Sequence, residues 1–214
     1  MSNYNPDIHH RRSIRLKGYD YSQAGLYFIT ICTQNRACLF GEIRRGEHIG
    51  SSNNEMILND AGNMVEHWYY ELQNKFHDIK CHEMVVMPNH FHCIIENVGM
   101  VPVGADLRVC PDVSGEHAIL GEHAGSPLRN VIQWFKTMTT NYYIRGVKQN
   151  NWTPFDKKLW QRNYYEHIIR NDESYQRISE YIISNPANWG IDKLKQFAGL
   201  LMIYSDIRWY DSSA

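Results

Sequence analysis

The segment EMVVMPNHFHCIIE, residues 83–96, decides the fold. Two short apolar runs flank a Pro-Asn pair, and runs of this composition favour β-strands. Proline cannot donate to a sheet ladder, so the break falls between two strands rather than within one. Alternate side chains of a strand share a face. The pattern therefore predicts that His90 and His92 point to one side of a sheet and Phe91 to the other.

Strand and helix patterns alternate on both sides of this segment. The predicted elements are a β-hairpin at 26–33 and 37–44, a helix at 59–79, a helix starting at the Ser-Pro pair 126–127, an aromatic strand at 159–169 and a helix at 171–184 before Pro186. Several strands are close enough to pair antiparallel. The order predicts an α+β fold, with a ferredoxin-like or RNA-recognition-like antiparallel sheet covered by helices.

The length of 214 residues predicts one domain, because domains commonly contain about 150 residues. We place it at 1–195, with a loop insertion at about 98–126 and a C-terminal tail at 196–214. The insertion lacks periodicity and repeats Gly-Glu-His-Ala at 115–118 and 121–124, as exposed loops tolerate. The N-terminus is polar and no apolar run is long enough for a membrane span. We expect a cytoplasmic protein without a membrane partner.

The charge balance excludes a global attraction to nucleic acid. Lys plus Arg number 22 and Asp plus Glu number 23, a formal net charge of -1. Phosphate binding would depend on local clusters, which are equally compatible with solvated surface charge. The two basic clusters are Arg11, Arg12, Arg15 and Lys17, and Lys157, Lys158, Arg162 and Arg170.

Five cysteines, an odd number without CxxC spacing, argue against a disulfide framework and a cysteine zinc site.

Two pairs of side chains have the spacing needed for chemistry. His90 and His92 would place two imidazoles beside each other with room for one metal ion, although an HxH triplet is equally compatible with polar residues on a wet sheet face. Tyr181 and Asn185 are four residues apart and would share one face of a helix. Tyr181 could instead be a packing residue, and Asn185 a helix cap before Pro186.

Four segments occur in a distinctive order. They are RRSIRLKGYDYSQAGLYFITICTQNR (11–36), VVMPNHFHCIIE (85–96), LWQRNYYEHIIRNDESY (159–175) and YIISNPANW (181–189). Together they resemble the REP-associated tyrosine transposases, a branch of the single-tyrosine HUH transposases. The resemblance covers roughly residues 8–195.

The resemblance implies an HUH transposase fold and a DNA-binding endonuclease that cleaves and rejoins hairpin-associated single-stranded DNA, such as REP-like repeats, in transposition and recombination. Tyr181 would be the catalytic residue and would form a 5'-phosphotyrosine intermediate. His90, His92 and Asn185 would hold a divalent ion. Mg²⁺ prefers oxygen ligands whereas Mn²⁺ accepts imidazole more readily, and both remain candidates. No ATP-binding motif is needed or present.

Further residues have candidate supporting roles. Tyr165 ranks second as nucleophile, and His82, Glu83 or His167 could assist proton transfer or orient a ligand, although each could equally be structural. Aromatic side chains beside arginine suit stacked bases, while aromatic-rich strands usually pack a core. The candidate DNA-binding residues are Arg11, Arg12, Arg15, Lys17, Arg129, Lys136, Trp160, Arg162 and Arg170.

The sequence is compatible with two other functions, to different degrees. A catalytically inactive, domesticated hairpin-DNA-binding protein would result if, for example, the 98–126 insertion obstructed the site. An ordinary metallohydrolase is disfavoured, because no HExxH motif accompanies the HxH triplet. The sequence leaves a monomer and a homodimer open, together with a site completed in one chain or by two. We expect association with the nucleoid when DNA is bound.

Overall fold

The computed structural model describes residues 19–45, 54–99, 126–192 and 194. Within them, no helix has the length and apolar character that crossing a membrane requires. The following candidate features lie wholly or mostly outside the described residues: Arg11, Arg12, Arg15, Lys17, the insertion at 98–126 and the tail at 196–214.

One four-stranded sheet forms the centre, in the order β4-β5-β1-β6, and every neighbouring pair is antiparallel. Its strands are β1 (Gly25–Cys32), β4 (Ile79–Met87), β5 (His90–Asn97) and β6 (Tyr165–Ile169). Helix α1 (Asp60–Lys75) precedes β4, and α2 (Leu128–Gln149) connects β5 to β6. This βαββαβ order with this strand order is ferredoxin-like, so the predicted fold class is confirmed.

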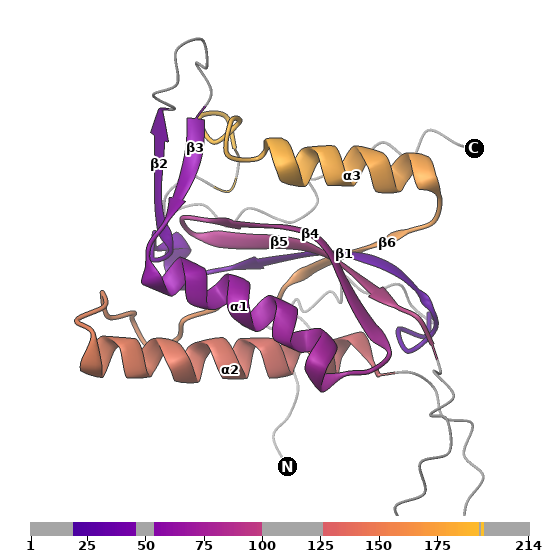
Figure 1. The fold of residues 1–214 in the computed structure, drawn as a ribbon, viewed down its shortest axis with the longest axis horizontal. Helices are drawn as coiled ribbons and strands as arrows, with labels where there is room; N and C mark the ends of the chain where they lie inside the picture. The colour runs from indigo at the N-terminus through magenta and orange to yellow at the C-terminus, as the bar shows by residue number, and fades with distance from the viewer. Residues whose placement is uncertain (1–18, 46–53, 100–125, 193, 195–214) are drawn as a thin grey trace, which may run out of the picture.

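The helices cover the two faces of the sheet unequally (Figure 1). Helices α1 and α2 lie side by side on one face, and α3 (Asp172–Ser184) crosses the other. A separate hairpin of β2 (Gly41–Arg45) and β3 (Asn54–Leu58) stands beside the sheet, after the short 3-10 helix η1 (Gln34–Arg36). The Asn54 side-chain amide donates to the Ala187 carbonyl at 3.4 Å, so this hairpin also contacts the residues after α3.

The main core lies between the sheet and the α1-α2 pair. Tyr27, Ile29 and Ile31 of β1 are fully buried there, and Phe91 of β5 stacks on Phe135 of α2 with ring centroids 5.2 Å apart. A smaller cluster under α3 joins Phe28, Ile94 and Ile169 to Ile178 and Ile182. Strands β1 and β5 are therefore buried on both faces, which is why they read as nearly continuous apolar runs.

Two predicted sheet elements are wrong. Residues 37–44 do not pair with 26–33, because η1 turns the chain away through Asn35 and Arg36, both with φ of 56°, and β2 pairs with β3 instead. The strand predicted at 159–169 is regular only in β6, and before it Trp160 makes an isolated bridge to Thr33.

Helix boundaries also differ from expectation. The helix predicted to run to residue 79 ends at Lys75, because Phe76 has extended backbone. Helix α2 begins after Pro127, since the Ser126 side chain bonds to Asp78 rather than capping the helix. Its buried face passes through Tyr143, while Tyr142 is 38% exposed. By contrast, α3 starts and ends as predicted, with Asn171 as its N-cap.

The described ends of the insertion meet at one place. The Val98 amide donates to the Asp78 carbonyl at 2.8 Å, and the Ser126 hydroxyl donates to the Asp78 carboxylate at 2.9 Å. Both ends lie beside Asn97, at the opposite end of β5 from His90. Asn97 and His90 are seven residues apart along β5, which corresponds to about 23 Å.

Candidate active site

Antiparallel pairing brings His90 and His92 to the face of the sheet that α3 covers. His90 pairs with Cys32 and His92 with Thr30 of β1. Both imidazoles are essentially without solvent exposure, and their ring centroids are 4.6 Å apart. Phe91 points into the main core on the opposite face, as the alternation predicts.

Asn89 determines which nitrogen of His90 carries the proton. Its side-chain NH₂ donates to the carbonyls of Arg36 and Leu194, which fixes its amide oxygen toward His90. That oxygen lies 2.8 Å from His90 Nδ1 and can only accept, so Nδ1 carries the hydrogen. The lone pair of His90 is therefore on Nε2. Burial, followed by the charges of His92 and Arg36, holds the pKa of His90 well below 6.5, so the ring is neutral.

His92 connects the sheet to the tyrosine helix. Its Nδ1 lies 2.8 Å from the Thr30 hydroxyl, and its Nε2 lies 3.3 Å from the Tyr181 hydroxyl. The ring also stacks on Phe28, with centroids 5.4 Å apart. Burial first, and then the charge of Arg36, lowers the pKa of His92 to about 3. A neutral imidazole can accept a proton or bind a metal ion.

Tyr181 lies on the inner face of α3, beside Ile178 and Ile182, which anchor the helix to the small cluster. Its ring meets Phe28 edge-on, with centroids 6.1 Å apart. Burial, and next the charge of Asp192, raises the pKa of Tyr181 to about 12, while the Asn185 side chain lowers it in part. The phenol is thus fully protonated at neutral pH, and acting as a nucleophile requires that its proton be removed.

Three buried polar atoms lack a hydrogen-bond partner beside this hydroxyl: His90 Nε2, Asn185 Oδ1 and Asp192 Oδ2. The Asp192 oxygen lies 3.6 Å from His90 Nε2. This distance is too long for a hydrogen bond, and neither atom carries a hydrogen to donate. Buried acceptors without a donor are costly, and a cation would satisfy them. Two imidazole nitrogens with an amide or carboxylate oxygen form a donor set that Mn²⁺ accepts, and Mg²⁺ less readily.

This candidate set contains few of the usual ligand types. Among the described residues, no group of three or more His, Cys, Asp and Glu side chains is arranged to hold a metal ion. The fit to a cation therefore depends on the amide oxygen of Asn185 in addition to the histidines. Asn185 is 2% exposed and follows α3 directly.

Three residues of the site were missed in the sequence: Thr30, Asn89 and Asp192. Asn89 directly precedes the HxH triplet, so its position was a usable signal for a residue that orients His90. Thr30 becomes relevant only through the pairing of β1 with β5. Asp192 follows a set of turns after α3, where no periodic pattern predicts its direction.

The supporting residues are dispersed. Tyr165 and His167 lie on β6 next to β1, and the Tyr165 ring meets Phe28 edge-on at 6.4 Å, so it remains the second candidate nucleophile. Trp160 is 5% exposed and its Nε1 donates to Thr139, which leaves little of its ring for a base to stack on. Arg170 is exposed at the end of β6. The predicted DNA-binding residues Arg129, Lys136 and Arg162 border one cavity.

His82 and Glu83 do not reach Tyr181, but they hold its helix. The Tyr175 hydroxyl donates to Glu83 at 2.8 Å and lies 3.2 Å from His82 Nδ1, while His82 Nε2 lies 2.9 Å from Glu96. His82 and Glu83 occupy the irregular part of β4, where the register with β5 shifts between Cys81 and Met84. This network ties the first half of α3 to the sheet.

Known proteins support the resemblance seen in the sequence. No protein-family model matches the chain. An uncharacterised protein of Haemophilus influenzae is 40% identical over 191 residues, covering 89% of this chain and 96% of that protein, so the two belong to one family. A second protein of that organism, provisionally assigned as a REP-associated tyrosine transposase, is 22% identical over 174 residues, covering 80% of this chain and 75% of that protein.

The chain is thus similar in sequence to a REP-associated tyrosine transposase. A solved structure of such a transposase bound to a REP hairpin is 21% identical to it, with a TM-score of 0.47, and covers 86% of this chain and 77% of that one.

The two buried histidines make the stability of the folded protein depend on pH. A histidine that the fold keeps neutral contributes fully to the free energy of unfolding at pH values above its unfolded-state pKa of about 6.5. This contribution is lost as the pH falls toward the lower pKa of the folded state. From about pH 7.5 to pH 5.5 the loss is about 1.4 kcal/mol per histidine. Urea unfolding with a chelator present should show that His92→Gln loses about 1.4 kcal/mol less than the wild type over this range.

Exposed His77 provides the control for this comparison. His77→Gln is expected to follow the wild-type pH dependence. Equal losses for the wild type and His92→Gln would contradict a neutral, buried His92.

The network around Tyr175 predicts a local effect on the tyrosine helix. Tyr175→Phe removes the hydroxyl that bonds Glu83 and His82, which should cost about 1 kcal/mol and speed hydrogen exchange in α3 more than in α1. Tyr142→Phe, at a 38% exposed position on α2, is the matched control. Unchanged α3 exchange in Tyr175→Phe would show that the network does not hold the helix.

Proposed function

We propose that the chain is a metal-dependent tyrosine transposase that cleaves and rejoins single-stranded DNA next to a hairpin. The supporting observation is the convergence of the Tyr181 hydroxyl with His92 Nε2 at 3.3 Å, beside unpartnered acceptor atoms of His90 and Asn185. A phenol nucleophile and a cation-binding donor set in one place are what phosphodiester cleavage through a covalent intermediate requires. We assign this activity to a single domain at 1–195, with the tail at 196–214 outside it.

We assign the divalent ion, Mn²⁺ or Mg²⁺, to His90, His92 and Asn185, with Asp192 as a further oxygen ligand. When bound, such an ion polarises a non-bridging phosphate oxygen and offsets the charge that develops on the leaving oxygen. Thr30 and Asn89 hold the two imidazoles in place through their Nδ1 atoms. This leaves the lone pair of His90 on Nε2, and His92 would bind the ion in the tautomer whose Nδ1 donates to Thr30.

In the proposed step, the Tyr181 oxygen bonds to phosphorus and the bond to the 3' oxygen breaks. The phenol proton leaves to solvent, and the 3' oxygen takes up a proton from solvent. The product is a 5'-phosphotyrosine link to one fragment of the cut strand, and the other fragment ends in a free 3'-OH. Attack of a 3'-OH on the link reverses these bond changes, so rejoining needs no external energy source.

The alternative is an inactive protein that only binds hairpin DNA. It would be favoured if the insertion at 98–126 covered the site. The described ends of the insertion bond to Asp78 beside Asn97, about 23 Å along β5 from His90. The insertion therefore begins and ends away from the candidate site. The presence of all four candidate residues, His90, His92, Tyr181 and Asn185, supports the active form.

The nucleophile can be tested with labelled hairpin-bearing single-stranded DNA and Mn²⁺, followed by denaturing electrophoresis. Wild type is expected to form a covalent protein-DNA band. Tyr181→Phe should abolish the band, since it removes only the attacking oxygen, while Tyr165→Phe should retain it. A band that survives in Tyr181→Phe and vanishes in Tyr165→Phe would assign the reaction to Tyr165.

A wild-type protein that shifts the same DNA in a native gel but never forms the band would support the inactive alternative. Binding of Tyr181→Phe to the DNA provides the control for folding. It should match wild-type binding within about twofold, because the ring and its packing on Phe28 remain.

The metal assignment predicts an effect of Asn185 on ion binding without DNA. Asn185→Ala removes an unpartnered buried oxygen and should weaken Mn²⁺ binding about tenfold or more, measured by electron paramagnetic resonance titration. Asn188→Ala, at an exposed position on the same turn segment, should bind as the wild type. Equal Mn²⁺ affinity for the two variants would remove Asn185 from the ligand set.

A further inference from the structure

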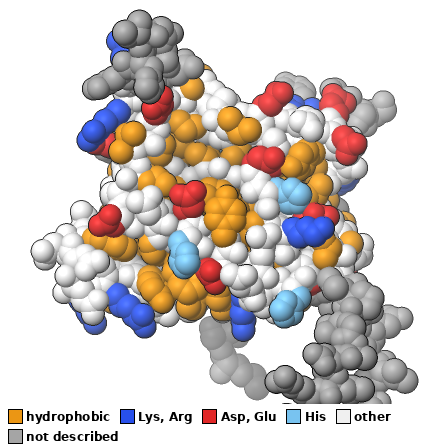
Figure 2. Space-filling view, viewed as in Figure 1, with side chains coloured by type: hydrophobic (Ala, Val, Ile, Leu, Met, Phe, Trp, Pro, Cys, Tyr) orange, Lys and Arg blue, Asp and Glu red, His pale blue; other side chains and the backbone are white. Residues whose placement is uncertain are grey.

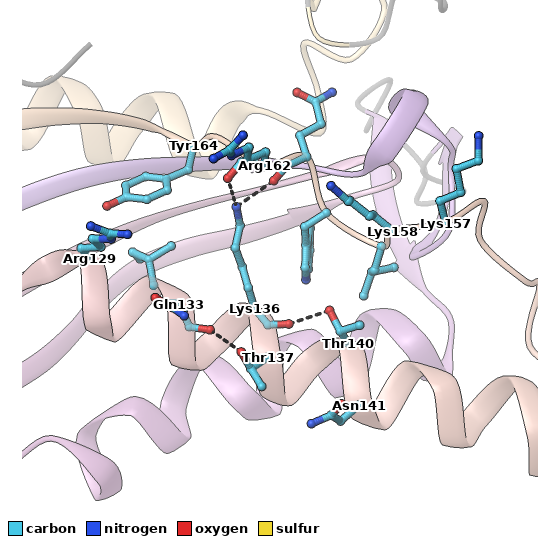
Figure 3. A pocket seen from close by; sticks show the side chains of 14 residues that line it. Arg129, Gln133, Lys136, Thr137, Thr140, Asn141, Lys157, Lys158, Arg162 and Tyr164 are labelled. Atoms are coloured by element: carbon cyan, nitrogen blue, oxygen red, sulfur yellow. Dashed lines mark hydrogen bonds between the residues drawn. The ribbon is translucent and has the colours of Figure 1, made fainter. Parts of the chain in front are cut away.

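A cavity of about 600 Å³ lies between α2 and the segment 157–164, on the face of the sheet opposite α3 (Figure 3). Five basic side chains border it, and no acidic side chain is among the described residues that line it. Those from α2 are on one wall, and the remainder are on the segment that leads into β6. The five are Arg129, Lys136, Lys157, Lys158 and Arg162.

Lys136 joins the two walls. Its Nζ donates to the carbonyls of Gln161 at 2.8 Å and Arg162 at 3.3 Å, and lies 5.6 Å from the centroid of the Tyr164 ring. Burial lowers the pKa of Lys136 to about 8, so the amine is still mostly protonated at neutral pH. Carbonyl partners carry no net charge. The cavity wall therefore holds a positive charge that these contacts do not neutralise, and an anion would complement it.

The cavity differs from the surface seen in Figure 2, where basic and acidic side chains are interspersed. Because the whole chain has a formal net charge of -1, an excess of five basic groups at one place is a local feature. Arg129 and Lys136 are seven residues apart on α2, about 10 Å along its axis. That span is longer than one small anion and suits neighbouring phosphates of one DNA strand.

The segment that forms one wall is also bonded to the strand beside His90. The Gln161 amide donates to the Cys32 carbonyl at 2.9 Å, and Cys32 pairs with His90 across β1 and β5. Two strand spacings, about 10 Å, therefore separate this wall from the backbone of His90 around the β6 edge of the sheet. A flexible single strand can turn around such an edge, whereas a stiff duplex cannot.

We propose that this cavity binds the phosphate backbone of the single-stranded DNA that flanks the phosphate held at Tyr181. The inference rests on the proposed function for its choice of ligand. The exposed groups Arg129, Lys158 and Arg162 pair with successive phosphates, while Lys136 positions the wall and adds its charge.

Fluorescence anisotropy with labelled oligothymidylate tests the cavity without requiring cleavage, in a Tyr181→Phe background. The variant combining Arg129→Gln, Lys158→Gln and Arg162→Gln should weaken binding about tenfold or more. The slope of log affinity against log salt should fall by about 2, since each lost contact to a single-stranded phosphate contributes about 0.7. The control combines Lys75→Gln, Lys80→Gln and Lys148→Gln, which removes three exposed lysines elsewhere, and should change affinity less than about threefold.

Equal weakening by the two triple variants would overturn the proposal, because charge alone and not its location would matter. Equal weakening of binding to a blunt DNA duplex would also overturn it, because that result would indicate a general basic surface. Tighter binding of oligouridylate than of oligothymidylate would overturn it as well, because that result would indicate an RNA site. Failure of the proposed function would be seen separately, as the absence of a covalent band in a wild-type protein that still binds oligothymidylate through the cavity.

Discussion

The antiparallel pairing of β1 with β5 positions the two histidines on which the candidate site depends. It sets Thr30 beside His92 and Cys32 beside His90, and it buries both strands between two layers of helix. A shift of one residue in this register would move both imidazoles into the main core and Phe91 toward α3. The large core against α1 and α2 prevents that shift, since Phe91 packs on Phe135 there. The stability of one face thus fixes the chemistry of the other.

Helix α3, on the other face of the sheet, packs on a smaller apolar cluster than α1 and α2 do. Only five buried apolar side chains among the described residues form the cluster beneath α3, and the Tyr175 hydroxyl adds bonds to His82 and Glu83. The helix that carries Tyr181 is therefore attached at its start by polar contacts and along its length by Ile178 and Ile182. Beyond it, Trp189 stacks on His90 at 6.0 Å, and Asp192 approaches the same ring. The site is formed where this lightly attached layer meets the rigid sheet.

Local sequence patterns predicted the residues whose positions depend on one element. Alternation in 83–96 placed the histidines on one face, and the helix from Asn171 placed Tyr181 and Asn185 together at its end. Residues that depend on pairing between distant segments were not predicted. Asp192 reaches His90 through turns without periodicity, and Asn89 bonds to Arg36 and Leu194, which are far apart in sequence. The misassigned hairpin has the same origin, because β1 pairs with strands whose residues are at least 58 positions away in the sequence.

The central claim is that His90, His92 and Asn185 bind one divalent ion next to the Tyr181 hydroxyl. Anomalous X-ray scattering from crystals soaked in Mn²⁺ tests it most directly. We expect one strong Mn²⁺ peak about 2.0–2.4 Å from both Nε2 atoms and the Asn185 amide oxygen, the distance at which side chains bind an ion directly. Absence of a peak at this place in an otherwise well-ordered crystal, or a Mn²⁺ ion bound only elsewhere, would contradict it.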